Sequence, residues 1–209
     1  MALGAAVLLF NGRDGEWRAD VAEAGKRGGI LVCASLTKPL QMPPDLWLLF
    51  APIKKTRTDF IVEKAVELGV ARILPVQTQH THADRIRQDK LQAHAMEAAE
   101  QCGATVVPQV AELVGLDKVL AGWDRARRIL WCDEGMVGGS FALTGGIAAR
   151  GAPWAILIGP EGGFSDREQA RLRGMDCIVP ISLGPRILRA DTAAVAALTL
   201  WQSVLGDWV

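Results

Sequence analysis

Short apolar runs alternate with amphipathic stretches from residue 45 to the end of the chain. The apolar runs predict buried strands at 46–51, 72–76, 129–132, 154–158 and 178–181. The stretches between them predict helices at 56–68, 84–102, 112–121, from Ser165 onward and at 191–205. Alternating strands and helices are typical of a parallel sheet covered by helices on both faces. We therefore expect an α/β fold for residues 45–209.

Two predicted helices begin with residues that are common at helix starts. Thr56 and Asp59 are expected to cap the first helix. This helix should bury Ile61, Ala65 and Leu68 and stop at Gly69. The pair Asp191-Thr192 is expected to cap the last helix.

The last helix is apolar around much of its circumference. Ala194, Leu198, Trp201 and Leu205 form one stripe, while Val195, Ala197 and Leu200 lie off it. A helix of this kind needs cover on two sides, which predicts a subunit interface.

The first part of the chain has a different pattern. Three short runs separated by glycine-rich turns predict strands at 6–10, 17–24 and 30–35. Proline and polar residues then interrupt both periodicities. The sequence is thereby divided into a β domain at 1–37, a linker at 38–44 and an α/β domain at 45–209.

Composition narrows the class of protein. Half of the 209 residues are hydrophobic, which is ample for a core and excludes intrinsic disorder. No apolar run approaches the roughly 20 residues that span a bilayer, and the start lacks the basic leader of a signal peptide. We expect a soluble, cytoplasmic protein with no membrane partner.

The spacing of the cysteines and histidines does not match a metal-binding pattern. The four cysteines contain no Cys-x-x-Cys pair and are expected to be buried free thiols: Cys33, Cys102, Cys132 and Cys177. His80 and His82 would share a face of an extended segment, yet no third ligand is near. A solvated loop is the better interpretation of this pair, and we expect no bound metal.

The formal net charge is zero, so a nucleic-acid partner would have to be held by a local basic patch. Most basic clusters are best interpreted as solvated faces. Lys54, Lys55 and Arg57 are an exception, as are Arg186 and Arg189, because both groups fall at strand-to-helix junctions where α/β proteins bind ligands.

Two glycine-containing loops mark the candidate pocket. The first follows the strand at 154–158 and contains Gly159, Gly162 and Gly163, which permit close approach of a ligand to the backbone. Ser165 and Glu168 then form the pattern of a capping box.

The second loop, at 182–189, follows the strand at 178–181 and precedes the last helix. The residues predicted to face the pocket are apolar: Leu157, Ile158, Ile181, Leu183 and Leu188. No Walker lysine follows the first loop. The pocket therefore suits a flat heteroaromatic ring better than a polyanion.

Glu161 and Arg189 carry the candidate chemistry. Glu161 is the carboxylate within the first loop, where it could orient a ligand, act as a base or hold backbone amides. Arg189 lies just before the last helix beside the apolar pocket, so we consider it a clamp for an anion or substrate.

Four ordered motifs resemble the RsmE family, which are ribosomal RNA uridine-N3 methyltransferases of the SPOUT superfamily. They are EKAVELG at 63–69, EQCG at 100–103, IGPEGG at 158–163 and LGPRILRADTA at 183–193. The resemblance implies a C-terminal trefoil knot that binds S-adenosylmethionine, a homodimer, 16S rRNA of the small ribosomal subunit as substrate, and an N-terminal PUA-like β-barrel. Residues 1–37 match the later part of that barrel, so we expect an N-terminally shortened form.

The resemblance also implies roles for single residues. Arg189 and Glu161 would be catalytic, and Lys54, Lys55, Arg57 and Arg186 would bind RNA. The cofactor would be bound by Leu157, Ile158, Gly159, Gly162, Gly163, Ile181, Leu183, Gly184, Leu188, Ala190 and Thr192. Gln79-His80 and Ala104 stand where many members have arginine, which removes two potential phosphate contacts.

Three alternatives stay open. A related SPOUT activity, ribose 2′-O-methylation, would need a base for a much weaker acid. A non-catalytic RNA-binding adaptor would keep the knot as a scaffold. A mononucleotide-binding hydrolase is disfavoured by the missing lysine.

Overall fold

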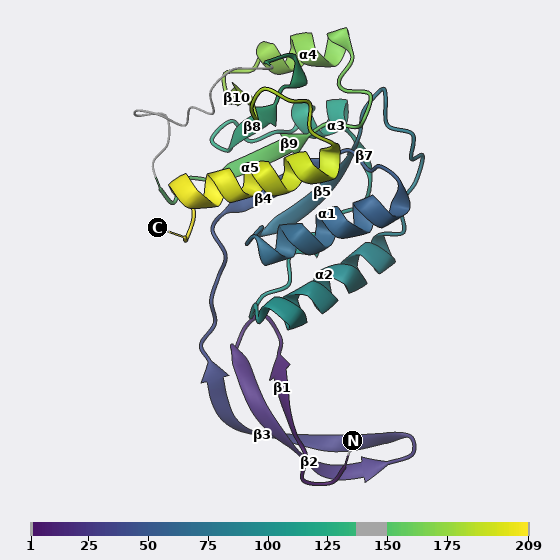
Figure 1. The fold of residues 1–209 in the computed structure, drawn as a ribbon. Coiled ribbons are helices and arrows are strands. Elements are labelled where there is room, and N and C mark those ends of the chain that lie inside the picture. Colours follow the sequence, from purple (N-terminus) through teal and green to yellow (C-terminus); the bar gives the residue numbers. More distant parts are fainter. Residues whose placement is uncertain (1, 137–149, 209) are drawn as a thin grey trace. The chain divides into compact units, whose positions relative to one another are not determined.

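The computed structural model describes residues 2–136 and 150–208, which form two compact units (Figure 1). One unit comprises Met1–Met42 with Ala99–Val107, and the other comprises Pro43–Ala98 with Pro108–Val209. The sequence also predicts an irregular, glycine-rich stretch at 137–151, and this stretch falls almost entirely outside the described residues.

The first unit is built on a three-stranded antiparallel sheet in the order β1-β2-β3. Its strands are β1 (Ala6–Phe10), β2 (Glu16–Gly25) and β3 (Gly28–Lys38). The side chain of Asn11 accepts hydrogen bonds from the amides of Arg13 and Asp14, which fixes the first turn. All three predicted strands are confirmed, but β3 extends to both sides of the expected 30–35 because its pairing with β2 continues through register shifts.

The second unit is built on a parallel sheet in the order β10-β8-β9-β4-β5-β6, with β7 also paired to β5. Its strands are β4 (Leu46–Phe50), β5 (Arg72–Gln77), β6 (Gln109–Val110), β7 (Val114–Gly115), β8 (Arg128–Cys132), β9 (Trp154–Ile158) and β10 (Ile178–Ile181). Every strand pair is parallel. The predicted α/β class is therefore confirmed, and the bounds of β9 and β10 agree with those expected from sequence.

Helices connect these strands, as Figure 1 shows. They are α1 (Lys55–Glu67), α2 (Gln88–Cys102), α3 (Leu116–Ala121), α4 (Asp166–Arg173) and α5 (Ala190–Leu205), with a short 3-10 helix at Glu134–Met136. Helix α5 packs against α1 and β9. Its predicted stripe of Ala194, Leu198 and Trp201 is buried, whereas Val195 and Leu200 are only partly buried.

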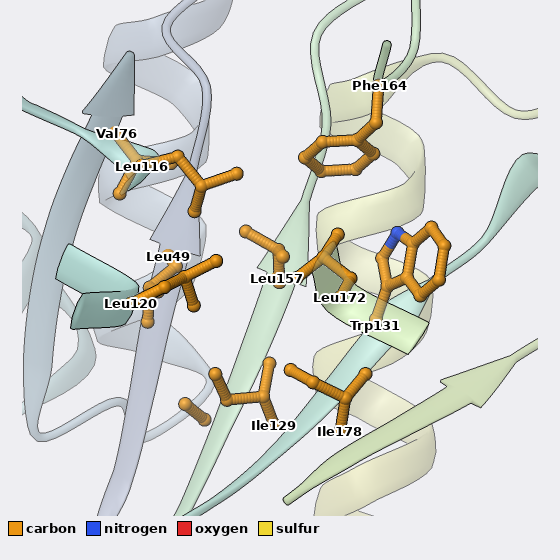
Figure 2. Packing of buried hydrophobic residues seen from close by; sticks show 11 residues of the cluster. Leu49, Val76, Leu116, Leu120, Ile129, Trp131, Leu157, Phe164, Leu172 and Ile178 are labelled. Carbon is orange, nitrogen blue, oxygen red and sulfur yellow. The ribbon is translucent and has the colours of Figure 1, made fainter. Parts of the chain in front are cut away.

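Alternating residues of the central strands separate the core into two faces. Leu49, Leu157 and Trp131 lie side by side in register and pack with Phe164 and Leu172 (Figure 2). The Trp131 and Phe164 rings meet edge to face with centroids 5.9 Å apart. This cluster forms the rigid base beneath the loops that follow β8 and β9.

Several helix starts differ from the prediction. Helix α1 begins at Lys55 with Lys54 as its N-cap residue, so Thr56 lies within the helix, and Leu68 is the partly exposed C-cap residue. Thr58 instead closes the junction, since its hydroxyl accepts from the amide of Ile53 and donates to the carbonyl oxygen of the same residue. The predicted end at Gly69 is confirmed, with φ of +73° in the left-handed region that favours glycine.

The starts of three other helices also differ from the predicted positions. Helix α2 begins at Gln88, not at residue 84, and α3 begins at Leu116 because Val114–Gly115 pairs with β5. Helix α5 begins after Arg189, so the cap expected at Asp191-Thr192 is wrong. Local propensity marks these segments as helical, but pairing and loop contacts decide where each helix starts.

The cysteine prediction was half right. All four thiols are free, but Cys33 and Cys102 are exposed, so the expected burial of both is wrong. Cys33 lies on β3, which is exposed along almost its whole length, and Cys102 is the last residue of α2.

Candidate functional site

A cavity of about 460 Å³ lies at the carboxyl ends of β8, β9 and β10, beside the segment that follows β4. Its volume falls within the range typical of small-molecule sites. The predicted site residues that line it are Lys54, Ile158, Gly159, Glu161, Ile181, Leu183, Gly184, Arg186, Leu188, Arg189 and Ala190. The two loops identified in the sequence therefore meet at one pocket.

The first loop is a tight turn between β9 and α4. The amide of Gly163 donates to the carbonyl oxygen of Pro160 at 3.0 Å, and Gly163 has φ of +67°. A Cβ added to Gly159 would lie 2.7 Å from the Phe164 ring, so glycine is required for this close approach. The predicted capping box is confirmed, with the Ser165 and Glu168 side chains each bonded to the other's backbone amide.

The second loop runs from Ser182 to Arg189 between β10 and α5. Gly184 has φ of +105°, and its amide donates to the Ser182 hydroxyl at 3.2 Å. Leu183 and Leu188 supply apolar walls. Ile187 also lines the cavity but is 77% exposed, so this side chain lies at the rim.

A third loop completes the site and was missed in the sequence. Asp133 and Glu134 follow β8 and line the cavity together with Cys132. The signal was present, because two carboxylates directly follow a buried apolar strand and lie at the same edge of the sheet as the other loops.

The Asp133 carboxylate is almost fully buried, with 3% of its side chain exposed. It accepts from the amide of Gly135 at 2.9 Å and from the Arg173 guanidinium at 2.9 Å. Desolvation, then repulsion by Asp133, raises the pKa of Glu134, and the nearby His80 opposes this shift. Burial raises the pKa of Cys132 to about 12, so this thiol stays protonated at neutral pH.

Four predicted cofactor residues do not line the cavity. Leu157 is fully buried in the core beside Trp131, so the prediction that its side chain faces the pocket is wrong. The reason is strand alternation, which directs Ile158 and Leu157 to opposite faces. Gly162 and Gly163 lie on another side of the turn, near His80 and Glu134, and Thr192 is exposed on α5.

The predicted RNA-binding cations separate into two groups. Lys55 is paired with Asp59 at 3.0 Å, and Arg57 is paired with Asp191 at 2.5 Å. The second group, Lys54, Arg186 and Arg189, lines the cavity. Within residues 2–136 and 150–208, the side chains of these three residues make no ion pair and no hydrogen bond. These three cations share the site with the carboxylates of Asp133, Glu134 and Glu161.

His80 and His82 are both exposed, in agreement with the solvated loop that was expected. The contact of His80 was not expected, because its Nδ1 atom lies 3.0 Å from the carbonyl oxygen of Gly162. Across the described part of the chain, no group of three or more histidine, cysteine, aspartate or glutamate side chains is arranged to bind a metal. In that same part, none of the helices has the length and apolar character that crossing a membrane requires.

The parallel sheet and the cavity at the carboxyl ends of its strands define an α/β protein with a pocket of the size that small molecules occupy. Residues 40–202 match the family model described as RNA methyltransferase domain, and the chain belongs to this family. The predicted resemblance to RsmE proteins is thereby confirmed at the level of the family.

Known relatives agree with this assignment. Ribosomal RNA small subunit methyltransferase E of Rickettsia conorii is 29% identical over 91% of this chain and 77% of its own length. The structure of Lpg2936 from Legionella pneumophila, in complex with the bound cofactor SAM, is 29% identical with a TM-score of 0.88, and the match covers 99% of this chain and 86% of that one. A ribosomal RNA small subunit methyltransferase E from Neisseria gonorrhoeae, bound to S-adenosyl methionine, shares the fold at 24% identity with a TM-score of 0.84, over 100% of this chain and 87% of that one.

Proposed function

We propose that this chain transfers a methyl group from S-adenosylmethionine to N3 of a uridine in the 16S rRNA of the small ribosomal subunit. The observation that carries the proposal is the cavity at the carboxyl ends of β8, β9 and β10, where the loops after β9 and β10 meet. Both loops contain motifs of the family to which the chain belongs. A relative named ribosomal RNA small subunit methyltransferase E and a neighbour with bound SAM support the proposal.

The residues at the cavity fit this cofactor. Apolar side chains and glycine backbone at Ile158, Gly159 and Leu183 suit the adenine ring. The other end of the ligand carries an amine, a carboxylate and a sulfonium. Unpaired cations and acidic side chains lie together at this site, so both signs of ligand charge have a counterpart.

When bound, S-adenosylmethionine supplies an electrophilic methyl group on a sulfonium. The acceptor would be N3 of the uracil, which must first lose its proton to a base. The protein must hold the two reactants in line, which contributes up to about 7–11 kcal/mol in ideal models. It must also hold the base unpaired, because N3 lies on the Watson–Crick edge.

Roles follow from position in the cavity. Arg189 stabilises the negative charge that develops on a uracil oxygen as the proton leaves. Glu161 lies in the first loop and lines the cavity, so it is the candidate acceptor of that proton. Lys54 and Arg186 hold phosphates of the RNA, and we keep Lys55 and Arg57 as weaker contacts because each is already paired with a carboxylate.

The same proposal extends to architecture. Strand β10 lies at the sheet edge, yet α5 packs against α1 and β9, so the chain turns back across the sheet, as the C-terminal trefoil knot of the SPOUT fold would require. The partly buried Val195 and Leu200 of α5 support a homodimer. We infer that the first unit corresponds to a PUA-like RNA-binding domain and that the protein acts in the cytoplasm, where it meets ribosomal subunits.

The test is incubation of the protein with hypomethylated small ribosomal subunits and labelled S-adenosylmethionine, followed by identification of the modified nucleoside by mass spectrometry. The proposal expects 3-methyluridine. A ribose 2′-O-methylated nucleoside would assign the alternative transferase activity. Calorimetry with S-adenosylmethionine alone provides the second arm, because a non-catalytic adaptor would bind RNA without binding the cofactor.

A further inference from the structure

The loop that follows β5 contacts the glycine turn after β9. The Nδ1 atom of His80 lies 3.0 Å from the carbonyl oxygen of Gly162 and 3.1 Å from that of Gly163. Carbonyl oxygens only accept hydrogen bonds, so Nδ1 carries the proton and donates to both. A Cβ added to Gly162 would lie 3.3 Å from the His80 Cβ atom, so the two backbones are also packed closely.

This loop is itself held in one conformation. The amide of Thr78 donates to the Thr81 hydroxyl at 2.9 Å, and the two hydroxyl oxygens are 2.8 Å apart. The amide of Gln79 donates to Glu168 at 2.9 Å, and the other oxygen of that carboxylate accepts from the amide of Ser165. His80 therefore extends from a loop that is anchored to the N-terminus of α4.

The turn presents different residues to the cavity and to His80. Pro160 and Glu161 line the cavity, whereas Gly162 and Gly163 do not. The hydrogen bond from the Gly163 amide to the Pro160 carbonyl oxygen joins the two halves of the turn. A contact that holds the glycine carbonyls therefore also fixes the half that faces the ligand.

We propose that His80 is a positioning residue, whose Nδ1–H fixes the 159–163 turn in the conformation that binds the cofactor. The identity of that cofactor rests on the proposed function, while the contact itself rests on the hydrogen bonds above. His82 offers a matched control, because it lies two residues away, is exposed and makes no hydrogen bond within the described residues.

The experiment compares His80→Ala, His80→Asn, His80→Gln and His82→Ala in the full chain. Calorimetry gives the dissociation constant of S-adenosylmethionine, and hydrogen exchange of the ligand-free protein reports on the peptide that contains residues 159–165. Loss of a hydrogen bond of ordinary strength predicts about 3- to 10-fold weaker binding and about 3- to 10-fold faster exchange for His80→Ala. His82→Ala should match the wild type in both measurements.

The two amide variants separate positioning from general loss of packing. The Nδ2 donor of asparagine occupies nearly the place of the histidine Nδ1, so His80→Asn should recover most of the affinity and protection. The glutamine donor lies farther along the side chain and should not recover them. Equal behaviour of His80→Ala and His82→Ala, or of His80→Asn and His80→Ala, would overturn the proposal. Failure of the wild type to bind S-adenosylmethionine would instead refute the proposed function, while exchange in the ligand-free protein still decides the role of His80.

Discussion

Gly163 connects the first loop to the acidic loop after β8, and its replacement by alanine has a calculable cost. Its φ of +67° lies in the left-handed region, and an added Cβ would overlap the Oε1 atom of Glu134. Two penalties therefore act together. Gly151 separates them, because it has φ of +79° but no heavy atom of the described residues within 4 Å of an added Cβ.

The backbone penalty alone is about 1–2 kcal/mol for an alanine in the left-handed region. We expect this loss of unfolding free energy for Gly151→Ala. In Gly163→Ala the Glu134 side chain must also leave its rotamer, which adds about 0.5–1.5 kcal/mol. The expected total of about 1.5–3.5 kcal/mol corresponds to a fall in melting temperature of roughly 3–14 °C in a protein of this size.

Urea unfolding monitored by tryptophan fluorescence is the assay, since Trp131 packs against Phe164 directly beside the turn. The double variant Gly163→Ala/Glu134→Ala removes the overlapping carboxylate, so its loss should return to that of Gly151→Ala. Equal losses for the two single glycine variants, or no recovery in the double variant, would show that the Glu134 contact does not constrain the turn.

Four further outcomes follow from the site. The pKa of Glu134 is raised above its ordinary value of 4.5, so the folded state keeps this proton longer than the unfolded state and stability falls as pH rises through the folded pKa. Glu134→Gln removes this loss, and unfolding titrations should show its stability relative to wild type increasing from about pH 4.5 upward. Arg189→Ala should lower the transfer rate about 100- to 1,000-fold in single-turnover assays while the cofactor dissociation constant changes little. Lys54→Ala should reduce the slope of log affinity for RNA against log salt by about 1 in binding titrations. A thiol reagent at neutral pH should label Cys33 and Cys102 first by mass spectrometry, because both are exposed while burial raises the pKa of the other two thiols.

The sequence was sufficient to predict the fold class and the longer strands, because buried parallel strands are continuous apolar runs with little ambiguity. Strands β9 and β10 agree with the predicted bounds for this reason. The two-residue strands β6 and β7 were missed, and β7 lies where a helix was expected. Helix starts were less accurate. The pairing of Val114–Gly115 with β5 shortens α3, and this long-range contact has no local signal in the sequence.

The candidate site was predicted in part for a similar reason. Glycine, proline and the capping box mark the loops after β9 and β10 locally. The loop after β8 has Gly135 but neither a proline nor a capping box, and it joins the site because β8 pairs with both β9 and β10. Asp133 and Glu134 were missed because this pairing was not used to place them, although they line the cavity as Glu161 does.

The distribution of charge at the site favours a zwitterionic ligand over a polyanion. Asp191 neutralises Arg57, and Asp59 neutralises Lys55, so two of the predicted cations are already engaged. Among the described residues, three unpaired cations remain at the cavity together with two carboxylates that have no cationic partner, Glu134 and Glu161, while the third carboxylate, Asp133, is already paired with Arg173. A triphosphate would be repelled by these acids, whereas a ligand that carries an amine, a carboxylate and a sulfonium meets opposite charges. This balance argues against the mononucleotide-binding hydrolase independently of the missing Walker lysine.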